Sequence, residues 1–327
     1  RLVVGHRVLG ELELIDPAAP PASRTLAREA VDGVPQDLSL GADGMIRVAT
    51  FVLSGQLGIE GFNRVLRVDP ATLTVLGNAW EDLGTDYKAV ATATGFGAVA
   101  ATGSGVVLVG DGSDTLLDVV ELAPGQPPAT PEDVAFVSAP DGSPERLYVL
   151  DFFRETIRPV TLTSGPPFEL GAEIPLAWSG APRVPFTAQT SDAEDGLYLF
   201  LSVGLVGGDA QQPNRVTCQS CHTDGVSDNL LRGVQVPPMW GLPDTGPWGR
   251  TGGRAVLADV VAGAINRHNE SGAPPIVENA EALFDAWLAV FDPPESLYLE
   301  ADGSLGADAA AGRTIFENVG CIECHAA

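Results

Sequence analysis

Lysine, cysteine, methionine and histidine are all scarce in this chain of 327 residues. It carries 18 basic residues, and Lys88 is its single lysine, against 43 acidic ones, so the formal net charge is −25. The sequence therefore lacks the basic surface with which proteins bind nucleic acid or anionic membranes. A solvated, soluble surface, a cationic protein partner or bound metal ions would suit this charge.

Long apolar runs are missing as well. No uninterrupted stretch reaches the roughly 18 to 20 residues that a membrane-spanning helix needs. The chain starts at Arg1 and shows no charged segment followed by an apolar one, so we interpret it as a mature form, or a fragment, from which a secretory signal has been removed. Its 45% of apolar residues suffice for the cores of two domains.

The four cysteines all lie in two copies of one motif. C-x-x-C-H occurs at residues 218–222 and again at 321–325. This is the attachment signature of c-type haem, because two thiols three positions apart can each add to a vinyl group of one porphyrin, and the next histidine reaches the iron. The sequence predicts two covalently bound c-type haems and leaves no cysteine for a disulfide. The attachment residues are Cys218, Cys221, Cys321 and Cys324, and the proximal ligands are His222 and His325.

Two other chemistries use similar cysteine spacings. A pair of zinc knuckles would need four nitrogen or sulfur ligands with matching spacings for each closed site. A thioredoxin-like dithiol would need no histidine after its second cysteine. The repeated histidine therefore favours haem.

Residues 1–205 are rich in Val, Leu, Thr and Gly and predict a mostly β domain. Short apolar stretches follow tight turns, as is typical of strands. The predicted strands are Met45–Ala49, Val106–Val109, Leu147–Leu150 and Leu197–Phe200. A recurring phrase at residues 14–17, 67–70, 120–124 and 160–162 has a spacing close to the roughly 40 to 50 residues of one propeller blade. We expect a propeller-like domain of about four or five blades. A β-sandwich is the alternative.

The spacing of apolar residues in the sequence changes at about residue 206. Apolar residues recur with helical spacing in Val256–Ile265 and in Ala280–Phe291, and the second segment is closed by Asp292-Pro293-Pro294. We expect a small α-helical haem domain at 206–300. A tail at 301–327 carries the second haem motif.

Segments around both motifs carry a family resemblance. These segments are residues 216–225, 236–242, 245–248 and 312–317. From Asp195 onward the chain resembles the haem domains of bacterial di-haem cytochrome c peroxidases and MauG-like proteins, a form often fused to β-propellers. Residues 140–142 and 146–149 resemble blades of the bacterial YVTN-type surface propellers. The cytochrome c resemblance implies haem attachment outside the cytoplasm, and hence a periplasmic, cell-surface or extracellular protein.

The chain departs from this family at one distal segment. Where the family has a histidine in a phrase like "TAPYxHDG", residues 246–252 contain none. Cleavage of an O–O bond needs an open iron position with polar groups on the distal side. The departure therefore favours electron transfer over peroxidase chemistry.

The candidates for a sixth iron ligand are few. His268 stands where the resemblance places a distal methionine, so we expect it to ligate the first haem and give a bis-histidine iron. His6 is the other spare histidine. Met239 aligns with a family leucine, and Met45 follows a hairpin turn, so both are expected to fill cores rather than to bind iron.

These observations predict a di-haem c-type cytochrome that passes electrons to redox partner proteins and has no substrate of its own. The second motif lies close to the last residue, so we also expect a homo-oligomer, a head-to-tail filament in which His6 of one molecule ligates the His325 haem of the next. The alternatives are a di-haem peroxidase or MauG-like enzyme, a fragment of one, ligation by His6 within one chain, and a surface-binding propeller with a redox appendage. The Asp-rich loops at 111–114 and 224–229 are expected to be turns rather than calcium sites.

Overall fold

The computed structural model describes residues 1–7, 9–31, 33–54, 60–81, 83–177, 180–202, 217–222, 239, 241–244, 246, 253, 255–268, 279–292, 299–300 and 302–321. The chain divides into two compact units, Arg1–Phe291 and Asp292–Ala327. Within the described residues, the first unit contains four antiparallel sheets and four α-helices, and the second contains one further helix. The predicted boundary near residue 205 lies outside the described residues, and the domain limits stay predictions.

Each sheet is a meander in which strands that follow one another in sequence are paired. The first sheet consists of β1 (Leu2–His6), β2 (Glu11–Ile15) and β3 (Thr25–Ala30). The second consists of β4 (Val34–Leu40), β5 (Ile46–Ser54), β6 (Glu60–Val68) and β7 (Val75–Ala79). The third consists of β8 (Tyr87–Ala93), β9 (Phe96–Ala101), β10 (Val106–Asp111) and β11 (Leu116–Glu121). The fourth consists of β12 (Pro131–Ser138), β13 (Pro144–Asp151), β14 (Thr156–Thr161) and the short strands β15 (Glu169–Leu170) and β16 (Ile174–Pro175), which both pair with β14.

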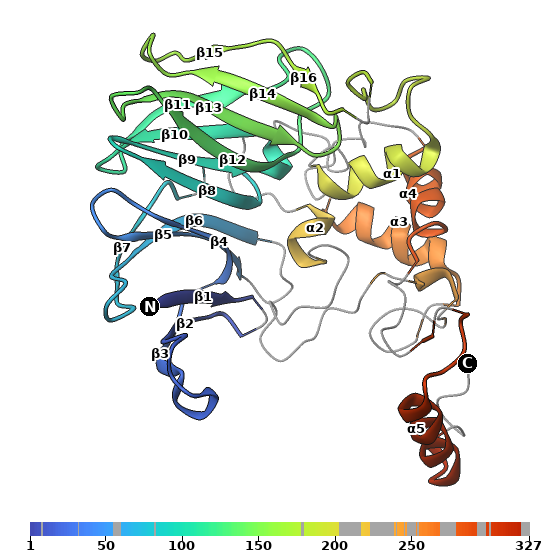
Figure 1. Ribbon diagram of the computed structural model, residues 1–327. Helices are drawn as coiled ribbons and strands as arrows, with labels where there is room; N and C mark the ends of the chain where they lie inside the picture. The colour runs from blue at the N-terminus through green and yellow to red at the C-terminus, as the bar shows by residue number, and fades with distance from the viewer. Residues whose placement is uncertain are drawn as a thin grey trace. The chain divides into compact units, whose positions relative to one another are not determined.

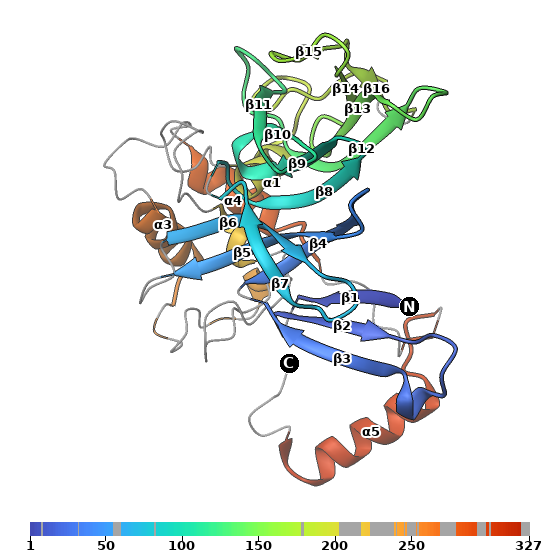
Figure 2. The same cartoon turned by 90° about the vertical axis from the view of Figure 1, so that its left-hand side faces the viewer.

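Consecutive sheets meet through their first strands, as blades of a propeller do (Figures 1 and 2). The backbone N–H of Val90 on β8 donates to the carboxylate of Asp37 on β4 at 2.9 Å. Lys88 on β8 forms an ion pair of 3.4 Å with Glu132 on β12. Four separate sheets in this arrangement do not form a sandwich, which has two. The prediction of a mostly β, propeller-like domain is confirmed at this level.

Hydrophobic clusters fill the space between successive sheets. One joins the first two sheets through residues such as Leu12 and Val48, and another joins the second and third through Val65 and Leu108. The largest joins the third and fourth sheets. Because each strand alternates its side chains between two faces, an inner sheet can contribute to the cluster on either side of it.

The tight turns anticipated from sequence are present. Gly44, Gly105 and Gly142 all have positive φ, the left-handed conformation that glycine adopts without strain. They lead into β5, β10 and β13, so three of the four predicted strands are confirmed, with β5 starting at Ile46. The recurring phrase does not fall at equivalent positions of the four sheets. In three sheets it coincides with the end of an internal strand, β2, β6 or β14, but in the third sheet it coincides with the end of the edge strand β11.

The fourth predicted strand, Leu197–Phe200, is wrong. These residues belong to helix α1 (Asp192–Leu201), whose capping box pairs Ser191 with Glu194. The Asp195-Gly196 pair lies inside the helix instead of forming a hairpin turn. A short apolar run fits a strand or a buried helix equally well by pattern, and here the cap decided the outcome.

The helices of the first unit share a core rich in aromatic rings. Helix α3 (Leu257–His268) and helix α4 (Ala280–Leu288) confirm the two predicted helices, with α4 ending three residues earlier than expected. The rings of Phe200, Trp287 and Phe291 pack on one another with centroids 4.6 to 4.8 Å apart. Tyr198 on α1 donates to the carbonyl of Pro128 at 2.9 Å, which joins α1 to the loop that precedes the fourth sheet.

The second unit contains helix α5 (Ala307–Asn318), which precedes the second haem motif. An i,i+4 ion pair of 2.8 Å between Arg313 and Glu317 supports it. Ile315, Phe316 and Val319 are exposed. In the part of the chain that the structure describes, no helix has the length and apolar character to cross a membrane.

Candidate haem-attachment site

The first C-x-x-C-H motif forms a single turn of helix, α2 (Cys218–Cys221), followed directly by His222. The backbone N–H of His222 donates to the carbonyl of Cys218 at 2.9 Å, which closes the turn. The two cysteines are therefore separated by one turn of helix. That is the spacing needed for two thioether bonds to one porphyrin.

A capping box holds the start of α2. The backbone N–H of Thr217 donates to the hydroxyl of Ser220 at 2.8 Å, and the N–H of Ser220 donates to the hydroxyl of Thr217 at 3.2 Å. Each hydroxyl oxygen is thus an acceptor within the box. Both hydroxyl groups donate hydrogen bonds to the carboxylate of Asp86. The hydroxyl of Thr217 donates to Oδ2, and that of Ser220 donates to Oδ1.

Asp86 lies in the loop that leads into β8, and hydrogen bonds join this loop to a neighbouring turn. Its carbonyl accepts from the N–H of Thr102 at 3.0 Å, at the start of the short 3-10 turn η2 (Thr102–Ser104). The preceding residue, Thr85, donates its N–H to the hydroxyl of Ser104 at 2.7 Å. A Cβ atom on Gly103 would lie 2.7 Å from Cγ2 of Thr217, so glycine is needed for α2 to approach this closely.

Burial dominates the electrostatics of this contact. Asp86 is only 8% exposed, and its burial raises the pKa of the carboxyl, while the hydroxyls of Ser220 and Thr217 and the charge of Lys88 oppose that rise. Burial, with a smaller effect of Asp86, also raises the pKa of Cys218 to about 12. The raised pKa keeps Cys218 in its thiol form at neutral pH.

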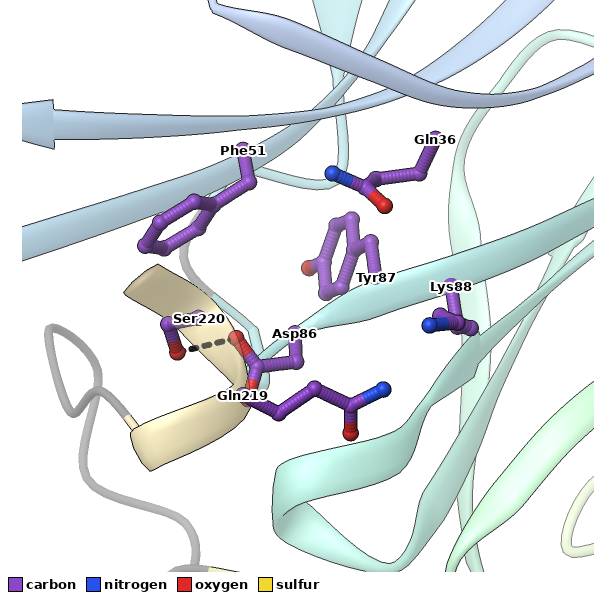
Figure 3. A pocket seen from close by; sticks show the side chains of 7 residues that line it. All are labelled: Gln36, Phe51, Asp86, Tyr87, Lys88, Gln219 and Ser220. Atoms are coloured by element: carbon purple, nitrogen blue, oxygen red, sulfur yellow. Dashed lines mark hydrogen bonds between the residues drawn. The ribbon is translucent and has the colours of Figure 1, made fainter. Parts of the chain in front are cut away.

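A cavity of about 10 Å³ lies between α2 and the first strands of the second and third sheets (Figure 3). Its wall includes Gln36, Phe51, Lys88 and Gln219. The side-chain oxygen of Gln219 is buried and makes no hydrogen bond to the protein. The space is about that of one water molecule.

The residues of the first motif fit covalent haem by their chemistry and their surroundings. Cys218 packs against the apolar cluster of α1, α3 and α4, which includes Met239, Phe284 and Trp287. An apolar, aromatic wall of this kind suits the faces of a porphyrin. Among the described residues, no three His, Cys, Asp or Glu side chains come together as a metal site.

The candidate distal ligands lie in different places. His268 is the last residue of α3 rather than part of a loop, and its side chain lies outside what the structure describes. Met239 is 6% exposed in the helical core, which confirms its predicted packing role. Met45 is half-buried just before β5.

His6 on β1 is held by a carboxylate. Its Nε2 lies 2.6 Å from Oε2 of Glu13, and the side chain of His6 is 30% exposed. Glu13 also accepts from the hydroxyl of Thr25 at 2.5 Å and from Arg28 at 3.2 Å. Ligation of iron by His6 would therefore use Nδ1, or would require Nε2 to leave Glu13.

The second motif begins at the end of the described residues. Cys321 is an exposed, free cysteine shortly after α5, whereas Cys324 and His325 lie outside the described part. The predictions for these residues stay predictions. The loop at 224–229 is likewise not described, but that at 111–114 is a turn, because Oδ1 of Asp111 accepts from the N–H groups of Ser113 and Thr115.

A larger cavity of about 300 Å³ lies at the hairpin tips of the second and third sheets. Arg47 reaches Asp114 at 2.8 Å and Asp43 at 3.2 Å in its wall. The indole N–H of Trp80 donates to the carbonyl of Asp114 at 2.8 Å. These polar groups are partnered within the wall, so they do not indicate a ligand.

Sequence reasoning missed Asp86 and Glu13. No local pattern identifies Asp86, which is separated from Thr217 by 131 residues. Polar and apolar residues alternate along β2, so the sequence alone indicates which face of this strand carries Glu13.

No family model matches the sequence, and no curated protein is similar to it. Similar solved structures include hydrazine synthase of Kuenenia stuttgartiensis, at 19% identity and TM-score 0.33 over 49% of this chain and 40% of that one. The periplasmic gluconolactonase of Pseudomonas aeruginosa matches at 18% identity and TM-score 0.38, over 55% and 56% of the two chains. The β-propeller domain of Cps50 (Swd1) from Myceliophteria thermophila matches at 15% identity and TM-score 0.33, over 46% and 44%. The chain spans about half the length of these structures, and likeness at this level carries no argument about function.

Proposed function

We propose that this chain is a di-haem c-type cytochrome that transfers electrons outside the cytoplasm and has no substrate of its own. The doubled C-x-x-C-H motif carries the proposal. The haems supply reversible one-electron couples when bound. Four cysteines attach them, His222 and His325 hold the irons, and the helical core keeps water away from the side of Cys218.

Peptide mapping tests the cofactor directly. The protein is produced with a system that attaches c-type haem and is then digested, and we expect haem on the peptides that contain residues 218–222 and 321–325. A Cys218→Ser, Cys221→Ser variant should lose the first haem and keep the second. Absence of haem from both wild-type peptides would overturn the proposal.

Axial ligation separates electron transfer from the peroxidase alternative. In this proposal His268 fills the distal position of the first haem, so the ferric iron is low-spin and saturated. We expect His268→Ala to convert one haem from low spin to high spin in the EPR spectrum, with Met239→Leu as a control that leaves the spin state unchanged. An unaltered spectrum of His268→Ala would contradict the assignment, and rapid turnover of hydrogen peroxide by the wild type would favour the enzyme.

The partners in this proposal are redox proteins with a positive surface. A net charge of −25 attracts such proteins over a distance set by the ionic strength. Electron transfer to a cationic cytochrome should therefore slow as salt is added. A rate that rises with salt would point to a different kind of partner.

A further inference from the structure

We propose that Asp86 is the positioning residue of the first haem: it fixes the turn that carries Cys218 and thereby sets how that haem is held. This inference rests on the proposed function and deepens it. The contact joins the third sheet to the haem motif across 131 residues of sequence.

A carboxylate suits this capping box. The hydroxyl oxygens of Thr217 and Ser220 each accept from one backbone N–H group, and each hydroxyl has one proton that needs an acceptor. The site is buried, with Thr217 3% and Ser220 4% exposed, so a hydroxyl proton left without an acceptor would cost free energy. Asp86 offers two acceptor oxygens, one for each proton.

The backbone around Asp86 is arranged for this contact. Asp86 has φ of +57°, a left-handed conformation in which Asp and Asn are tolerated better than most residues. Its loop is fastened to η2 by the bonds of Thr102 and Thr85. Gly103 leaves room for the methyl group of Thr217, so shape and hydrogen bonding both fix α2 against the sheet.

Asp86→Asn is the most informative variant. Asn keeps the left-handed backbone but has one acceptor oxygen, and its amide presents a donor to the second hydroxyl. We expect hydrogen exchange at the amides of Thr217 and Ser220 in the haem-loaded protein to accelerate roughly tenfold or more. We also expect the EPR signal of the first haem to shift while that of the second stays unchanged.

Matched variants separate positioning from general destabilisation. Thr217→Val removes one hydroxyl and should reproduce both effects, whereas Thr217→Ser keeps the hydroxyl and should retain wild-type behaviour. Asp151→Asn alters another buried carboxylate, bonded to Thr130 in the fourth sheet, and should leave the first haem's signal and the α2 amides unchanged. Gly103→Ala places a methyl group against Thr217, Thr85 and the carboxylate of Asp86, so it should displace α2 from this contact by steric means, and it keeps the test available where a polar variant fails to fold.

The outcomes distinguish the two proposals. If residues 218–222 carry no haem in the wild type, the proposed function fails and the positioning role fails with it. If haem is present and both Asp86→Asn and Thr217→Val keep wild-type exchange and EPR signals, the positioning role alone is overturned. An equal shift of both haem signals would also overturn it, because it would indicate a global effect.

Discussion

Glu13 organises the residues around His6 in the first sheet. Glu13 is 5% exposed, and its carboxylate accepts hydrogen bonds from Thr25, His6 and Arg28. These donors lower the pKa of Glu13 from 4.5 to about 2, with the Thr25 hydroxyl contributing most and His6 next. His6 is therefore oriented by a carboxylate, as ligand histidines often are.

We expect this network to give the protein a distinct loss of stability in acid. A carboxylate whose pKa is lower in the folded state contributes stability that is complete above its unfolded pKa and is lost as pH falls through the folded value. The window here runs from about pH 4.5 down to about pH 2. Urea midpoints measured across this window should fall more steeply for the wild type than for Glu13→Gln, while Glu29→Gln on the neighbouring strand keeps the wild-type slope. Equal slopes for the wild type and Glu13→Gln would count against the network.

At this scale, local pattern predicts chemistry but not partners. The haem motif could be read from a few neighbouring residues, and the family resemblance implied a core position for Met239, which is buried in the helical core. Asp86 could not be found this way, because its partners Thr217 and Ser220 are brought to it only by the tertiary fold. The local sequence pattern indicates the capping box, but it does not indicate that Asp86 accepts the hydrogen bonds of its two hydroxyl groups.

Helix α1 illustrates what decides the type of an element. The Asp195-Gly196 pair suggested a hairpin turn, yet the Ser191 to Glu194 capping box starts a helix instead. Gly196 serves packing, because a Cβ atom there would lie 2.1 Å from the carbonyl oxygen of Leu283 on α4. Strand β13 also follows a glycine turn, and its alternation of buried and more exposed residues agrees with the strand predicted there.

A glycine-to-alanine pair tests this helix contact. Gly196→Ala should destabilise the protein by about 1–3 kcal/mol, because the added methyl group forces α1 and α4 apart. Gly263→Ala on α3 meets no atom within 4 Å, so its helix propensity should leave stability unchanged or raise it by up to about 1 kcal/mol. Urea denaturation measures both. A cost for Gly196→Ala no greater than that for Gly263→Ala would show that the helices do not pack this closely.

On the scale of the whole molecule, the sheets and the helical core belong to one compact unit, and the second haem motif belongs to another. The mostly β character of the first unit follows from turns and strand patterns that the sequence displays, whereas the recurring phrase behind the expected blade number does not mark equivalent positions. The docking of α2 on the third sheet depends on side chains far apart in sequence, so no local pattern predicts it. Ile315 and Phe316 on α5, and Val319 directly after it, are exposed apolar residues close to the second motif.

The head-to-tail polymer is a prediction about assembly. If His6 of one molecule ligates the second haem of another, the contact is heterologous and propagates unless rotation closes a ring. Electron microscopy of the haem-loaded protein should show filaments that disappear in His6→Ala. Glu13→Gln should weaken them, because His6 loses its orienting partner. Discrete particles at every concentration, or filaments that survive in His6→Ala, would rule out polymerisation through His6.

The central claim is that this chain is a di-haem c-type cytochrome, and the mass of the intact, denatured protein tests it most directly. Non-covalent haem is first removed by acid-acetone extraction, so only thioether-bound haem remains on the polypeptide. The account predicts a mass equal to the polypeptide plus two haems, falling by one haem in a Cys218→Ser, Cys221→Ser variant. A wild-type mass with one haem or none would contradict it.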